Sequence, residues 1–154
     1  MTMTAYAPAS DEIKAGPASD QLPRLGELIG RPLRSPLDLA NAVEEGVKTD
    51  VVARLLDIGL ARSELDFVIP VRTLSHRVKL GQPLTPEESG RAVRVAHLVF
   101  QAEEVFGDVR QAAEWLRKPM RRFEGRTPLA LAHTEQGAQL VEQVLGQAQE
   151  GYFA

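Results

Sequence analysis

The chain has 154 residues, of which 44% are hydrophobic and 25% charged, and its formal net charge is -3 at pH 7. This length suits one domain or a small pair with a core that needs no covalent staples. The absence of cysteine excludes disulfides, thiolate nucleophiles and cysteine-zinc sites. The mildly acidic balance argues against a protein that coats nucleic acid or membranes, so any DNA binding must use a local basic face.

The distribution of apolar residues predicts an all-α helical bundle, because apolar side chains recur at helical spacing and no segment reads as a strand. No apolar run approaches the roughly 18 residues that span a bilayer, and the amino terminus lacks the basic start and apolar centre of a signal peptide. We therefore expect a cytoplasmic protein with no membrane partner.

Residues 1–34 are predicted to be a disordered or loosely packed arm. Residues 1–21 are rich in Ala, Pro, Ser, Thr and Gly and show no apolar period, so they bury too little surface to offset chain entropy. Residues 22–34 hold leucines and an isoleucine among prolines and glycines. This second part is interpreted as either a short helix or an extended segment laid over the core.

Residues 35–81 are predicted to form a separate helical domain. Ser35, followed by a proline, offers an N-cap and a first-turn residue for a helix that ends at Gly46. Thr49 is the predicted N-cap of a second helix, which Gly59 closes.

Two further short helices, over residues 64–68 and 70–79, are separated by a tight turn and give this domain the outline of a helix-turn-helix. The second of them carries the candidate DNA-binding residues Arg72, Thr73, Ser75, His76, Arg77 and Lys79. Such residues on a short surface helix are usually only a solvated face. The alternative is DNA contact, since the guanidinium groups of Arg72 and Arg77 suit phosphates or guanine edges.

Residues 82–154 are predicted to form a second helical domain that begins with the longest helix of the chain. Thr85 and Glu88 form a capping box, and apolar residues follow on two faces as far as Phe106. A helix with two apolar faces is either deeply buried or shared with a partner surface. We expect it to be the central scaffold, and it is also a candidate for a homodimer contact.

Shorter helices follow, and caps and stops mark their ends. Gly107 ends the long helix and Asp108 caps the next, which Pro119 stops. Thr127, with the proline after it, and Thr134 begin two more helices.

These segments form an ordered series of motifs: FGD at 106–108, WLRKP at 115–119, GRTPL at 125–129, and a last helix that opens near Gly137 and closes with LGQAQEG at 145–151. The series closely resembles the toxin-binding domain of the Xre/MbcA/ParS antitoxin family. A lone W-L-x-x-P would be a weak signal, whereas the whole ordered series is specific. Departures at Met120-Arg121-Arg122 and Phe123-Glu124 bear on the identity of the partner, because such positions often set contact specificity.

The resemblance implies that the chain is the antitoxin of a bacterial type II toxin-antitoxin pair. The partner in this family is typically a RES-domain toxin that consumes NAD, and the carboxyl-terminal segment of the antitoxin blocks the toxin's active site. Family members carry an Xre-like helix-turn-helix domain before the toxin-binding domain, which implies operator DNA as a further partner and autoregulation. The candidate toxin-binding residues are Trp115, Arg121, Arg122, Arg126, Gly151, Tyr152, Phe153 and Ala154.

The densest basic cluster of the chain comprises Arg117, Lys118, Arg121, Arg122 and Arg126. It is either a solvated connector with cations favourably placed at a helix end, or a docking surface for an acidic partner patch, or a source of phosphate contacts. Its place inside the resemblance favours the protein partner.

No enzyme site is predicted. His76, His97 and His133 stand on different segments without a carboxylate at ligand spacing, and neither a Gly-rich phosphate loop nor G-x-S-x-G is present. We expect no metal, no cofactor, no small-molecule substrate and no enzymatic activity. The alternative to an antitoxin is a free-standing helix-turn-helix transcriptional regulator with a C-terminal dimerisation domain, which would bind DNA without a toxin and tolerate loss of the last four residues.

Overall fold

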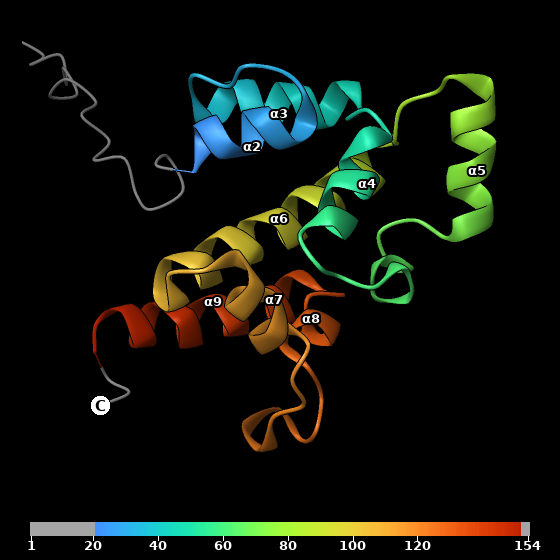
Figure 1. Cartoon of the computed structure of the whole chain (residues 1–154). Helices are drawn as coiled ribbons and strands as arrows, with labels where there is room; N and C mark the ends of the chain where they lie inside the picture. The colour runs from blue at the N-terminus through green and yellow to red at the C-terminus, as the bar shows by residue number, and fades with distance from the viewer. Residues whose placement is uncertain (1–20, 152–154) are drawn as a thin grey trace, which may run out of the picture.

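The computed structural model describes residues 21–151, and this part of the chain is entirely helical, which confirms the predicted all-α fold (Figure 1). The α-helices are α2 (Leu22–Ile29), α3 (Pro36–Glu45), α4 (Asp50–Asp57), α5 (Val71–Leu80), α6 (Pro86–Phe106), α7 (Val109–Leu116), α8 (Pro128–Leu131) and α9 (Glu135–Gln149). Two 3₁₀ helices, η1 (Arg62–Leu65) and η2 (Arg121–Phe123), lie in the connections. None of the described helices is long and apolar enough to cross a membrane.

Helix α6 is the central scaffold, as its two apolar faces predict. It contacts α2, α3 and α4, which come from the N-terminal half of the chain, and α7 and α9, which come from the C-terminal half (Figure 1). Its buried apolar residues are Ala92, Val95, Ala96, Leu98, Val99, Phe100 and Ala102. The predicted capping box is present: Thr85 Oγ1 accepts from the Glu88 amide at 3.2 Å, and the Thr85 amide donates to the Glu88 carboxylate at 2.8 Å.

Residues 22–33 belong to the core, so the arm predicted over 1–34 extends too far into the chain. Helix α2 buries Leu25 completely and contacts α4 and α6, and Leu33 after it is also buried. Of the two alternatives for this stretch, the short helix is correct, because its apolar residues recur at helical spacing and can all face α4 and α6. Residues 1–20 lie outside the described residues.

The caps that the sequence predicts are largely observed. Side-chain oxygens of Ser35, Asp108, Thr127 and Thr134 accept hydrogen bonds from backbone amides in the first turns of their helices. Thr49 precedes α4 but makes no side-chain cap hydrogen bond. The helix predicted over 64–68 is instead the shorter η1.

Helix α5 stands away from the rest of the bundle (Figure 1). None of its residues is buried, and Val71, Val78 and Leu80 are exposed. Leu74 packs against the core from the inner side of the helix. With so little apolar contact, the position of α5 depends on polar interactions as well.

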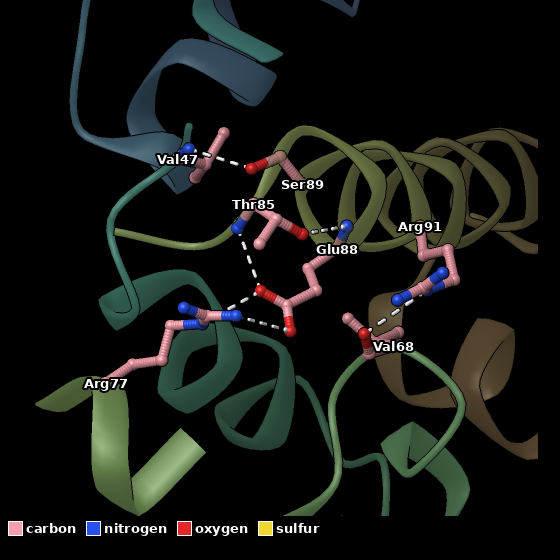
Figure 2. Close-up of polar contacts among 7 residues, drawn as sticks. All are labelled: Val47, Val68, Arg77, Thr85, Glu88, Ser89 and Arg91. Atoms are coloured by element: carbon pink, nitrogen blue, oxygen red, sulfur yellow. Dashed lines mark hydrogen bonds and ion pairs between the residues drawn. The ribbon is translucent and has the colours of Figure 1, made fainter. Parts of the chain in front are cut away.

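The main polar attachment of α5 is the ion pair between Arg77 and Glu88 (Figure 2). Arg77 Nε donates to Glu88 Oε1 at 3.0 Å, and Arg77 Nη2 lies 3.4 Å from Glu88 Oε2. The Glu88 side chain is only 8% exposed. Burial acts to raise the pKa of Glu88, but hydrogen bonds from the Thr85 backbone and from Arg77 outweigh it and hold the pKa below its ordinary value.

The same turn of α6 fixes two other segments (Figure 2). Ser89 Oγ accepts from the Val47 amide at 2.9 Å, in the connection between α3 and α4. Arg91 Nε donates to the Val68 carbonyl at 3.3 Å, just before α5. Both hydrogen bonds link residues more than twenty positions apart in the chain, so this turn holds the N-terminal helices in place.

The approach of α8 to α9 depends on Gly137. A Cβ at this position would lie 1.9 Å from the Leu131 carbonyl oxygen, so Gly137→Ala forces the backbone apart. We expect the free energy of unfolding in urea to fall by about 1–3 kcal/mol. Gly146→Ala on the same helix is the control, because nothing lies within 4 Å of its Cβ, and it should be neutral or stabilising by up to about 1 kcal/mol. Equal stability of the two variants would contradict the close approach.

The lowered pKa of Glu88 predicts an acid-dependent stability. A carboxyl group with a pKa depressed by folding stabilises the protein above its unfolded value, near 4.5, and this contribution is lost as the pH falls through the folded pKa. Glu88→Gln should lower the free energy of unfolding by about 1–3 kcal/mol at neutral pH, because it leaves Arg77 unpaired. The difference from the parent should shrink below pH 4.5, where the parent loses the same ion pair.

The control is Glu87→Gln, which changes an exposed carboxylate in the same helical turn. A loss of stability equal to that of Glu88→Gln, or a Glu88→Gln effect that is independent of pH, would show that the Arg77 ion pair contributes nothing to stability.

Candidate functional site

The outer face of α5 presents a compact polar surface. Arg72, Ser75, His76 and Lys79 are all exposed, and their spacing of i, i+3, i+4 and i+7 places them on one side of the helix. We call these four residues the outer α5 face. They carry hydrogen-bond donors and two fixed positive charges on a helix that projects from the bundle, a geometry suited to a nucleic-acid groove.

The other two predicted DNA-binding residues, Thr73 and Arg77, point the other way. Both are partly buried on the side of α5 that faces the bundle. Two nitrogens of the Arg77 guanidinium are bound by Glu88 (Figure 2), so Arg77 positions α5 and is not offered to phosphates or guanine edges. Periodicity alone separates the two sides of α5, but it does not tell which side faces the bundle.

A second candidate surface lies at the other end of α6. An apolar groove of about 550 Å³ opens between the end of α6, α7, the connector after α7, and α9. The groove is lined by Val105, Phe106, Trp115, Met120, Arg122, Val144, Leu145 and Ala148, and we call it the C-terminal groove. The Phe106 and Trp115 rings are in contact at its wall, with centroids 5.7 Å apart and planes inclined by 42°.

The connector beside the groove presents three of the predicted toxin-binding arginines. Arg121, Arg122 and Arg126 are exposed there, whereas Phe123 between them is buried and anchors the loop. The loop is closed by backbone hydrogen bonds from the Met120 amide to the Arg126 carbonyl at 3.1 Å, and from the Gly125 amide to the Met120 carbonyl at 2.9 Å. The three guanidinium groups are therefore carried by an ordered turn next to an apolar groove.

Arg117, from the same basic cluster, is used inside the fold, because its Nε donates to Glu64 of η1 at 2.7 Å.

The predicted toxin-binding residues at the carboxyl end are described only in part. Gly151 follows α9, is exposed, and has a left-handed backbone with φ of +82°. Tyr152, Phe153 and Ala154 lie outside the described residues. The structure thus brings Trp115 and Arg122 together at the groove, with Arg121 and Arg126 on the same connector, and Gly151 lies three residues after Ala148 of the groove wall.

Sequence reasoning missed two features of these sites. Glu88 was predicted only as a capping residue, and its pairing with Arg77 had no local signal. The groove was not predicted, because the apolar faces of the long helix were expected to be buried or shared with a partner and no open surface was assigned to them. The second apolar face of α6 was the available signal, since an apolar face that extends to the end of a helix often meets a partner.

Another surface pocket contains none of the predicted site residues. It measures about 830 Å³, lies between α6 and α9, and is lined by charged and polar side chains that include Arg91, His97 and His133. Across one wall, Arg94 Nη1 donates to the Ala132 carbonyl at 3.2 Å. Within residues 21–151 no group of three or more His, Asp or Glu side chains is arranged to hold a metal ion.

Comparison with known protein families covers both surfaces. Residues 38–97 match the antitoxin Xre-like helix-turn-helix domain, and residues 101–151 match the antitoxin Xre/MbcA/ParS C-terminal toxin-binding domain. The outer α5 face lies in the first region and the C-terminal groove in the second. The helix-turn-helix match extends well into α6, beyond the boundary predicted at residue 81.

Individual relatives agree with this assignment. An Antitoxin Xre of Pseudomonas putida is 40% identical over 131 residues, which cover 84% of this chain and 82% of the relative. An Antitoxin Xre of Yersinia enterocolitica is 30% identical over 82% of this chain and 88% of the relative. A Sphingobium protein named Prs ADP-ribosylating antitoxin is 27% identical over 78% of this chain and 83% of the relative. The chain therefore belongs to the Xre antitoxin family, with an Xre-like helix-turn-helix domain followed by a toxin-binding domain.

Proposed function

We propose that this antitoxin neutralises a RES-domain toxin that degrades NAD, and that its carboxyl-terminal segment blocks the toxin's active site. The observation that carries the proposal is the arrangement of the toxin-binding region. Helix α9 ends at Gln149, and the exposed Gly151 follows Ala148 of the groove wall by three residues. The connector arginines Arg121, Arg122 and Arg126 are exposed, and Arg122 lines the same apolar groove, a combination suited to a protein partner.

The identity of the partner rests on the resemblance and on one relative. The motif series from Phe106 to Gly151 is similar to that of antitoxins whose partners are RES-domain toxins. The name of the Sphingobium relative refers to ADP-ribosylation, which is a reaction that consumes NAD. Both observations support an NAD-consuming toxin.

The chemistry of the tail fits an inhibitory plug. Tyr152 and Phe153 provide aromatic surface. Burial of two rings in a cleft would contribute roughly 3–6 kcal/mol before the loss of tail entropy is subtracted.

The proposal predicts that the tail is needed for inhibition more than for binding. A chain that ends at Gly151 should still bind the toxin through the groove and the connector arginines, but NAD consumption by the toxin should recover. NAD consumption and binding affinity are to be measured with the full chain and the truncated chain. The control is Leu140→Ala, which alters an exposed apolar residue of α9 outside the groove.

Three outcomes are informative. Full inhibition by the truncated chain would refute the plug and move the blockade to the groove and connector. Loss of both binding and inhibition would make the tail an anchor and not a plug. If the full chain neither binds nor inhibits the toxin, a free-standing transcriptional regulator becomes the better description.

We also propose that the antitoxin represses its own operon by binding operator DNA as a homodimer through the outer α5 face. The net charge of the chain is -3, so the contact must be local. The outer α5 face provides it, with two fixed cations and two hydrogen-bonding side chains at the spacing of one helical face. The Arg77–Glu88 ion pair supports this role, because it fixes the helix without using the outer residues.

The DNA proposal predicts unequal effects of mutations on α5 and elsewhere. Arg72→Ala and Lys79→Ala should each weaken binding to the region upstream of the gene, and loss of a phosphate contact should reduce the slope of log affinity against log salt by about 1. Lys48→Ala, an exposed lysine of the same domain outside α5, is the control. Equal effects of the three substitutions would show that α5 does not contact DNA, and binding by the monomer alone would refute the dimer.

A further inference from the structure

The C-terminal groove leaves an apolar surface uncovered in the described part of the chain. Leu145 at its floor is buried, but Phe106, Trp115, Met120 and Val144 are only partly buried. Its volume of about 550 Å³ falls within the range of about 300–1,000 Å³ that is typical of ligand pockets. Contiguous exposed apolar surface of this kind usually has a specific occupant.

The end of α9 lies directly beside the groove. Val144 and Ala148 form one wall, and Gly151 follows Ala148 by three residues. At the helical rise, Ala148 is about 4.5 Å and Val144 about 10 Å from Gly151 along the axis. The three residues after Gly151 span at most about 10 Å when extended, so they can reach the length of this wall.

The backbone at Gly151 also favours a return of the chain. Its φ of +82° is the left-handed conformation that ends helices, and its amide donates to the Ala148 carbonyl at 3.2 Å. In such endings the residue that follows commonly makes an apolar contact with the last turns of the helix. The residue that follows here is Tyr152, with Phe153 after it.

We propose that Tyr152 and Phe153 occupy the C-terminal groove of their own chain when the antitoxin is free. The groove suits aromatic occupants, because Phe106 and Trp115 offer ring faces and edges and Met120 offers a polarizable sulfur. The tail is close enough to reach the groove and belongs to the same chain. Its two aromatic rings suit the aromatic and thioether side chains that line the groove.

The consequence for regulation rests on the proposed function. If the tail is also the inhibitory plug, toxin and groove compete for the same two rings. The tail must leave the groove before it enters the toxin, so the apparent affinity of the plug is reduced by the fraction of free tails. The groove would then keep Tyr152 and Phe153 from contacting other apolar surfaces until the antitoxin binds the toxin.

The test uses the isolated full-length chain, so its outcome does not depend on the toxin. Trp115 is the single tryptophan and lines the groove, so its fluorescence reports what covers the groove. The variant is Tyr152→Ser with Phe153→Ser, and the matched control is Leu140→Ser on α9 outside the groove. Trp115 is excited at the red edge of its absorption band, where tyrosine does not absorb. Its emission spectrum and its quenching by acrylamide are measured over a dilution series of the protein.

We expect the tail variant to shift Trp115 emission to longer wavelength and to raise its quenching constant, at every protein concentration, whereas Leu140→Ser leaves both unchanged. Identical spectra of the parent and the tail variant would overturn the proposal. If the two differ only at high concentration, the groove holds the tail of a second copy, which also overturns it.

A second measurement does not depend on spectra. A carboxypeptidase should remove the last three residues slowly from the parent and faster from Ala148→Glu, which places a carboxylate in the groove wall. Ala148 is partly exposed near the end of α9, so this variant is expected to fold, as circular dichroism will check. Equal digestion rates in two folded proteins would refute a seated tail.

Discussion

The need to bury α6 on most of its circumference is the constraint on which the rest of the structure depends. A helix that is apolar on two faces cannot be stable in water by itself, so it must be enclosed by several neighbours. Here α2, α3 and α4 from the N-terminal half of the chain, and α7 and α9 from the C-terminal half, all pack against it. The two domains of this antitoxin therefore share one continuous helix, and each functional surface is attached to one of its ends.

The amino-terminal end of α6 carries the polar attachments. Within its first two turns, Glu88 binds helix α5, and Ser89 and Arg91 bind two different connections (Figure 2). Glu88 does so at the N-terminus of a helix, where backbone amides and the dipole stabilise a carboxylate even though it is buried. This explains how α5 can project with little apolar contact and still present its outer face in a defined direction. The carboxyl-terminal end of α6 instead contributes Val105 and Phe106 to the groove, about 25 Å away by helical rise.

That separation has a functional meaning in the Xre family context. A rigid helix lies between the surface proposed for DNA and the surface proposed for the toxin, so both can be occupied together without competing for the same side chains. The carboxyl-terminal tail is different, because the groove and the toxin would compete for it. If the groove binds the aromatic tail in the free antitoxin, the two rings would be shielded from solvent. Their release from the groove would then depend on contacts that only the toxin supplies.

The sequence by itself determined most of the helix boundaries, most of their caps and the family, because these depend on residues within a few positions of one another. Ser35, Asp108 and Thr134 cap helices through amides two or three residues away, and the motif series from Phe106 to Gly151 is read in order along the chain. The tertiary structure alone decided that residues 22–33 are core, that Arg77 pairs with Glu88, and that the ends of α6, α7 and α9 enclose a groove. Those features arise from contacts between separate elements, where periodicity gives the faces of a helix but not what lies opposite each face.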